Sequence, residues 1–177
     1  PVNDGYGDGR WRTSIQDFEP ALSTLNDWLS YWGTLTGSSN ESLLSSLIVN
    51  PEFKIQFINR FADALNSCFT TAHFNGVVNS TFDEIAPFLA EHSNRTTVID
   101  FYTASNKTKL LNWGTDHPTV QRNSIKSFFN ITNTVDITIS LSNNDAGTVK
   151  MNTIDITSDT PGISDNPYPW TGIYFQN

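Results

Sequence analysis

The stretch NPEFKIQFINRFADALNSCF, residues 50–69, decides the fold of this chain. Its large apolar residues recur at every fourth position, which is the spacing of one face of an α-helix. A proline in the first turn suits a helix start, because that turn needs no backbone N–H donor. The pattern predicts a central helix over 51–69 whose apolar stripe faces a core: Phe53, Phe57, Phe61, Leu65 and Phe69, flanked by Ile58, Ala62 and Cys68.

The polar residues of the same stretch fall mostly on the other face of the predicted helix. Asn59, Arg60, Asp63 and Asn66 are therefore expected on the side away from the core. Cys68 is the only cysteine, so no internal disulfide can form. Its place on the stripe predicts a small buried apolar side chain.

Helical spacing also occurs on both sides of this stretch. Helices are predicted over 21–32 and 41–49 before it, and over 72–91, 105–113 and 118–129 after it. Pro87 falls inside the predicted helix 72–91 and is expected to kink it or to mark a join between two helices.

At Val135 the apolar period changes from helical to alternating, which is typical of a half-buried strand. Residues 143–147 have the composition of a hairpin turn, so 148–152 is predicted as the partner strand of 135–141. Further strands are predicted at 10–16, 154–157 and 170–175.

These elements predict an α+β fold that is mainly helical, with about five to six helices. A short N-terminal strand precedes the helices, and a C-terminal antiparallel hairpin or small sheet follows them. We expect two parts, a helical part over 1–133 and a small β-strand appendage over 134–177 packed on it.

Charge and hydropathy exclude some classes of partner for this chain of 177 residues. It carries 18 acidic and 10 basic residues, a net charge of −8. Nucleic-acid backbones are bound by clustered Lys and Arg, so nucleic acid is not an expected partner. No apolar run approaches the ~20 residues that span a bilayer. The low Lys content with abundant Ser, Thr and Asn favours a secreted or cell-surface location.

Three aromatic residues near the N-terminus are the candidate ligand platform. Trp28, Tyr31 and Trp32 lie within about one helical turn of each other. Flat rings can stack on the apolar face of a sugar or on a peptide, and the same spacing equally fits core packing.

Residues 50–66 resemble the "NPEF…FINRFAD…LN" run of the CotH family, the spore-coat-protein-H-like domains. The resemblance continues through Glu84-Ile85-Ala86-Pro87 and through 112–129. The segments 135–152 and 169–175 resemble a small β module that often follows such domains. The chain is therefore expected to be the C-terminal portion of a CotH-like domain followed by that module.

CotH-like proteins are described as atypical kinases that use ATP with a divalent metal such as Mg or Mn. By the resemblance, the nucleotide-binding lobe and the catalytic Asp lie upstream of Pro1. Asp17 and Glu19 fall at acidic positions that would hold the metal, although their reading as solvated acids that cap or flank the next helix is favoured. We therefore expect no complete catalytic set and no cofactor in this chain, with Mg or Mn and ATP used by the parent protein.

The leading functional hypothesis is a structural or interaction subdomain of a secreted CotH-like, kinase-like surface protein. Its expected partners are the upstream kinase-like lobe, and envelope or coat proteins or glycans. The alternative is an extracellular adhesion or carbohydrate-binding module that uses the aromatic residues. The two hypotheses differ in whether the chain binds a glycan by itself.

Overall fold

The structure of the chain is a computed structural model that describes residues 45–95, 104–143 and 147–176. Residues 45–48 are helical. The labelled elements follow in chain order: α3 (Pro51–Leu65), α4 (Thr71–Ile85), the 3₁₀ turn η2 (Ala86–Phe88), α5 (Leu89–Arg95), α6 (Ala104–Phe129), β1 (Asn133–Ile139), β2 (Val149–Met151), β3 (Ile154–Ile156) and β4 (Trp170–Gln176). The α+β class is confirmed. The predicted strand 10–16 and helix 21–32 lie outside the described residues.

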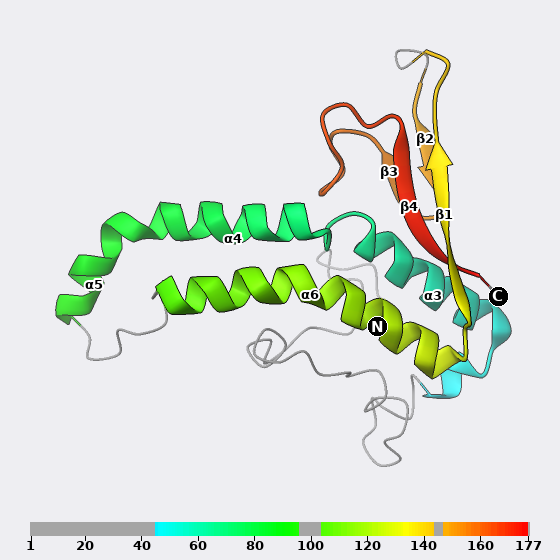
Figure 1. Ribbon diagram of the computed structural model, residues 1–177, viewed down its shortest axis with the longest axis horizontal. Helices are drawn as coiled ribbons and strands as arrows, with labels where there is room; N and C mark the ends of the chain where they lie inside the picture. The colour runs from blue at the N-terminus through cyan, green and yellow to red at the C-terminus, as the bar shows by residue number, and fades with distance from the viewer. Residues whose placement is uncertain (1–44, 96–103, 144–146, 177) are drawn as a thin grey trace, which may run out of the picture.

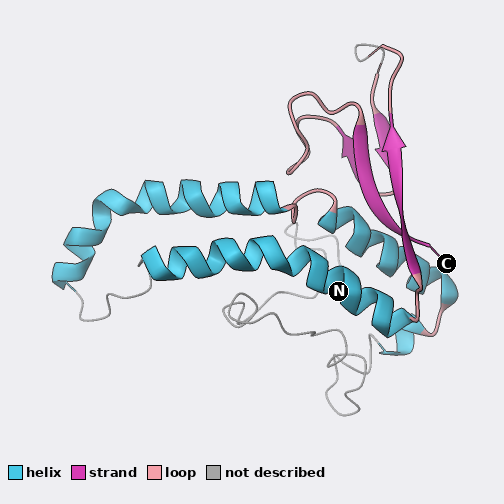
Figure 2. Ribbon diagram, viewed as in Figure 1, coloured by secondary structure: helices cyan, strands magenta, loops and turns pink. Residues whose placement is uncertain are grey.

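The helices and the strands occupy different ends of the described part of the chain (Figures 1 and 2). Helices α4 and α6 lie side by side, and α5 turns away at the far end of α4 (Figure 1). The four strands stand beside α3, and β4 contacts this helix. Helix α3 is thus the element that joins the helical end to the strands.

Helix α3 begins as the sequence predicts and ends earlier. Asn50 caps its N-terminus, because the Asn50 side chain accepts hydrogen bonds from the backbone N–H groups of Glu52 and Phe53. The helix ends at Leu65, not at Phe69 as predicted. Asn66 is the C-cap, and the chain turns before the next helix begins at Thr71.

The early end of α3 corrects two burial predictions. Cys68 is exposed, although the stripe predicted a buried thiol. Phe69 is also exposed, with 41% of its surface accessible. Both residues follow the turn at Asn66, so the helical period no longer directs them to the core. The stripe is buried at Ile58, Ala62 and Leu65.

The segment predicted as one helix over 72–91 is helical, with a join at Pro87. Thr70 caps α4, and its hydroxyl accepts a hydrogen bond from the backbone N–H of His73. Pro87 lies in η2, which connects α4 to α5. A proline lacks the backbone donor of a continuing helix, which accounts for the change in direction seen in Figure 1.

Helix α6 is continuous from Ala104 to Phe129, so the prediction of two helices over 105–113 and 118–129 was wrong. Pro118 lies inside it and cannot donate to the carbonyl of Gly114, four residues earlier. The hydroxyl of Thr71, in the first turn of α4, donates to that carbonyl instead (3.2 Å). A tertiary contact therefore replaces the missing hydrogen bond.

Helices α4 and α6 approach closely at Gly114. A Cβ atom there would meet the ring of Phe74 and the side-chain oxygen of Asn75. We expect Gly114→Ala to destabilise the fold by about 1–3 kcal/mol, because overpacking outweighs the helix propensity of alanine. Gly76→Ala is the matched control, since a Cβ atom at Gly76 would have no neighbour within 4 Å. It should stabilise by about 0.5–1 kcal/mol. Urea unfolding measures both, and equal shifts would contradict the close approach.

The strands pair differently from the predicted hairpin. β1 pairs antiparallel with β4 from Asn133–Gln176 to Ile139–Trp170, and not with 148–152. β2 pairs instead with β3 across the two-residue turn Asn152-Thr153. The prediction paired two strands that are consecutive in the sequence. In the structure, β1 pairs instead with the last strand, β4, which also contacts α3.

Two apolar clusters hold the parts together. The first packs Ala62 of α3 against strand residues, among them Ile154, Ile156, Trp170 and Tyr174. The second joins Ile58 of α3 to residues of α6 and the segment after it: Ile125, Phe129 and Ile131. Helix α3 contributes to both clusters. No helix in residues 45–95, 104–143 and 147–176 is long and apolar enough to cross a membrane.

Candidate functional site

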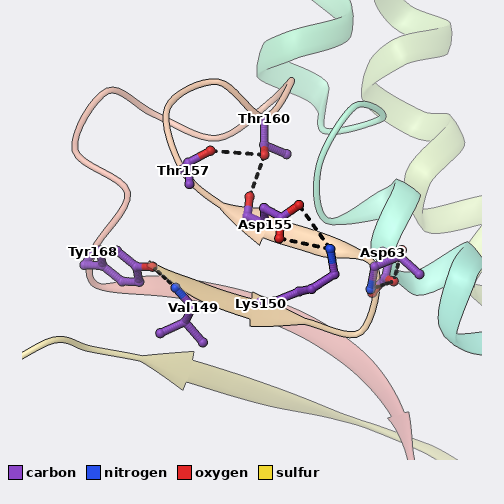
Figure 3. A network of polar contacts seen from close by, with 8 residues as sticks. Asp63, Val149, Lys150, Asp155, Thr157, Thr160 and Tyr168 are labelled. Atoms are coloured by element: carbon purple, nitrogen blue, oxygen red, sulfur yellow. Dashed lines mark hydrogen bonds and ion pairs between the residues drawn. The ribbon is translucent and has the colours of Figure 1, made fainter. Parts of the chain in front are cut away.

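The candidate site is the junction of α3 with the β2–β3 turn, and Asp63 lies at its centre (Figure 3). Asp63 is only 2% exposed. The backbone N–H of Thr153 donates to one carboxylate oxygen (3.0 Å), and so does the Thr153 hydroxyl. The Asn152 amide (3.3 Å) and the Tyr174 hydroxyl (2.9 Å) donate to the other. The carboxylate thus fixes both the hairpin turn and β4.

Asn66 makes a second anchor one turn further along. Its side-chain amide donates to the carbonyl of Ile173 (2.9 Å), and its side-chain oxygen accepts from the Ile173 N–H (3.0 Å). The amide therefore pairs with β4 as a neighbouring strand residue would. Asp63 and Asn66 were predicted to lie away from the core, and both are buried. That prediction was wrong because strands far along the chain cover this face.

Arg122 of α6 joins the second anchor. Its guanidinium donates to the Asn66 side chain (2.8 Å) and to the carbonyls of Leu65 (3.2 Å) and Ile173 (3.2 Å). Burial lowers the pKa of Arg122, although its ordinary pKa is so high that it remains a cation. One side chain therefore ties α6, the C-terminus of α3 and β4 together.

The hairpin has its own supporting contacts (Figure 3). The Tyr168 hydroxyl donates to the carbonyl of Ile156 (2.9 Å) and accepts from the N–H of Val149 (2.8 Å), so it bridges β2 and β3. Lys150 and Asp155 form an exposed ion pair at 3.0 Å. The β2–β3 hairpin is therefore held by Asp63 at its turn and by Tyr168 at its opposite end.

The hydrogen bond between Tyr174 and Asp63 should make the free energy of unfolding fall at alkaline pH. Burial raises the pKa of Tyr174 above its ordinary value near 10, and the hydrogen bond to the Asp63 carboxylate raises it further. The folded chain keeps this proton when the unfolded chain loses it. The stabilisation is therefore complete below about pH 10 and falls as the pH rises further.

Urea midpoints at about pH 8 and about pH 10.5 measure this fall. We expect Tyr174→Phe to unfold more easily at the lower pH, because it loses the bond to Asp63, and to show a smaller fall between the two values. An equal fall in both chains would contradict the assignment to Tyr174.

A hollow of about 570 Å³ opens beside the Asp63 centre. One wall is the stretch of α3 from Phe53 to Arg60, and the other is the turn Asn152-Thr153. The rings of Phe53 and Phe57 stack with centroids 6.2 Å apart. A smaller hollow of about 260 Å³ adjoins it, and Arg60 and Thr153 line both.

A separate polar cluster lies between α4 and α6. The rings of Trp113 and His117 stack with centroids 3.9 Å apart. Buried polar atoms of Asn75, Trp113 and His117 have no hydrogen-bond partner among the described residues, and buried groups of this kind are often satisfied by internal water. Burial lowers the pKa of His117, so the folded chain favours the neutral imidazole.

His117 therefore predicts a loss of stability in acid. Below its ordinary pKa near 6.5, the unfolded chain takes up a proton that the folded chain resists. The stabilisation is present above about pH 6.5 and falls as the pH is lowered. His117→Phe keeps a ring against Trp113 and removes this titration, so its urea midpoint should fall less between about pH 7.5 and about pH 5.5. A fall as large as that of the parent chain would contradict the prediction.

The site residues predicted from the sequence lie in another part of the chain. Asp17 and Glu19, the predicted metal ligands, and Trp28, Tyr31 and Trp32, the predicted platform, all lie outside the described residues. Within the described ranges, no group of three or more His, Cys, Asp or Glu side chains is arranged to hold a metal ion. Arg122 was not predicted as a site residue. It lies in the segment 112–129 that resembles the family, but its role depends on Asn66 and Ile173, which are distant along the chain.

The fold and the site define an α+β protein in which buried polar side chains of α3 anchor the C-terminal strands. The chain belongs to the CotH kinase protein family, whose family model matches residues 6–130, more than half of the chain. Comparisons with curated proteins and with solved structures find no match. The matched segment contains Asp63, Asn66 and Arg122, while the strands that they anchor follow it.

Proposed function

We propose that this chain is a structural and interaction subdomain of a secreted or cell-surface CotH-like protein. One observation carries the proposal. Asp63 and Asn66 are polar residues of the family run, the stretch 50–66 that resembles the CotH family, and their side chains anchor β4 and the β2–β3 turn. These side chains are buried and hydrogen-bonded, so they are not available to a substrate. In this chain, the family run therefore serves to anchor the strands on α3.

Phosphate transfer would belong to the longer parent protein. The parent would use ATP with Mg or Mn through an upstream kinase-like lobe, which is the first partner of this chain. Asp17 and Glu19 are the residues here that would hold the metal, through their carboxylate oxygens. Envelope or coat proteins or glycans are the proposed outer partners. The low Lys content and abundant Ser, Thr and Asn support the extracellular location.

Incubation of the chain with labelled ATP, Mn²⁺ and a generic acidic protein tests the proposal. We expect no label on the chain or on the added protein. Labelling that disappears in an Asp17→Asn, Glu19→Gln chain would overturn the proposal, because the chain would then hold a working centre. Glu91→Gln combined with Asp155→Asn is a suitable control for a remote charge change, since it also removes two negative charges, from surface ion pairs with Arg95 and Lys150.

A further inference from the structure

The hollow between α3 and the β2–β3 turn contains unused hydrogen-bonding groups. Gln56, Asn59 and Arg60 line it, and their side chains make no hydrogen bond or ion pair with the described part of the chain. Asp63 and Asn66, further along the same helix, are fully engaged with the strands. Helix α3 is therefore divided into an anchoring part and a part whose polar groups face a hollow.

Arg60 differs from the other described arginines. Arg95 pairs with Glu91, and Arg122 donates to Asn66 and to two carbonyls. Arg60 is exposed and has no such partner among the described residues. A guanidinium offers five donors in a plane and matches a carboxylate with two parallel hydrogen bonds. Within the described residues, the hollow thus offers a cation that has no ion-pair partner.

The opposite wall is held in place before any ligand arrives. Both residues of the turn Asn152-Thr153 donate to Asp63, and Asn152 has a left-handed backbone with φ 49°. The Asn152 amide nitrogen is used by Asp63, so the Asn152 side chain is also held in place. A fixed wall lowers the entropy that ordering a binding site would otherwise cost.

We propose that this hollow binds an acidic saccharide, one that carries a carboxylate. The ring of Phe53 meets the apolar face of the sugar ring, and Phe57, which packs on Phe61 and Phe129, supports it from behind. The amides of Gln56 and Asn59 bind hydroxyl groups, and Arg60 pairs with the carboxylate. The volume of about 570 Å³ lies in the usual range of small-ligand sites.

The charges around the hollow set where the carboxylate lies. Asp63 and Asp155 line the smaller adjoining hollow on the far side of Arg60. Asp155 is neutralised by Lys150, whereas Asp63 accepts its hydrogen bonds from neutral donors. The carboxylate of the sugar therefore lies on the Phe53 side of Arg60. This site is independent of phosphate transfer, so the outcome of its test and that of the labelled-ATP assay are separate.

Calorimetric titration of the chain with a hexuronic-acid trisaccharide, and with the neutral hexose trisaccharide of the same linkage, tests the proposal. We expect saturable binding of the acidic sugar, with the neutral one at least about tenfold weaker. Arg60→Gln should weaken acidic-sugar binding by at least about tenfold, because it removes a charge-assisted pair. Phe53→Ala should weaken binding of both sugars.

Two variants separate binding from folding. Arg60→Lys keeps the charge and loses the planar fork, so it should bind the acidic sugar with intermediate strength. Arg95→Gln changes the net charge equally at a remote ion pair and should bind as the parent chain does. Three results would overturn the proposal. They are no binding by the unsubstituted chain, equal binding by the Arg60→Gln chain, and equally tight binding of a triglutamate peptide.

Discussion

Replacing Asp63 by alanine is expected to destabilise the chain by about 3 kcal/mol or more. The change leaves the buried Tyr174 hydroxyl without its acceptor and removes the part-buried bonds that the Thr153 N–H and hydroxyl make to the carboxylate. Each buried donor without a partner costs about 1–3 kcal/mol, and bonds to a charged acceptor are stronger than neutral ones. Urea unfolding followed by circular dichroism measures the loss. We expect the midpoint to fall well below that of the parent chain.

Asp155→Ala is the matched control for the loss of a carboxylate. Asp155 lies on the neighbouring strand, and its ion pair with Lys150 is about 60% exposed on both sides. Exposed pairs contribute about 0–1 kcal/mol, so this variant should unfold almost as the parent chain does. If the two variants shift the midpoint equally, the Asp63 carboxylate does not hold the hairpin.

A double-mutant cycle assigns the loss to a particular contact. Tyr174→Phe removes only the hydroxyl that donates to Asp63. Because the two groups touch, their separate effects should not add, and the coupling should be about 0.5–3 kcal/mol. Additive effects would place the contribution of Asp63 in the turn Asn152-Thr153 alone.

The sequence predicts the local features of this fold well. Phenylalanines at every fourth position locate α3. Ile58 and Ala62, which flank this stripe, are buried as it predicts. The join at Pro87 follows from the missing donor of proline. These predictions depend on residues within one or two helical turns, where the spacing of side chains along the chain also fixes their positions in space.

Features that depend on distant partners were predicted wrongly. Asp63 receives its donors from Thr153 and Tyr174, which are 90 and 111 residues away along the chain. Helical periodicity assigns a charged residue to solvent, and only the position of the strands reverses that assignment. Pro118 likewise breaks a helix by local rules, whereas Thr71 supplies the hydrogen bond that keeps α6 continuous.

The candidate site shows the same division. The family run around Asp63 and Asn66 could be found from the sequence, because a resemblance needs only the order of residues. The role of these two residues could not, since it depends on the register that brings Ile173 beside Asn66. Arg60 was correctly placed on the outer face, but the hollow beside it exists only because the turn Asn152-Thr153 forms the second wall.

Ending the chain at Asn130 is expected to abolish cooperative unfolding. This truncation keeps the segment matched by the family model and removes every described strand. Asp63 and Asn66 would lose their partners in the strands while Ala62 would lose its apolar cover. Thermal unfolding followed by circular dichroism should show helical signal without a sharp transition.

Two further truncations locate the part that matters. A chain ending at Pro169 lacks β4 and the last residue, and it loses both Ile173 and Tyr174, so it should behave like the chain ending at Asn130. A chain ending at Gln176 keeps every pair of β1 with β4 and should unfold as the parent chain does. A cooperative transition in the chain ending at Asn130 would show that the strands are a separable appendage. Its absence there and in the chain ending at Pro169 would make β4 part of the fold that the family run builds.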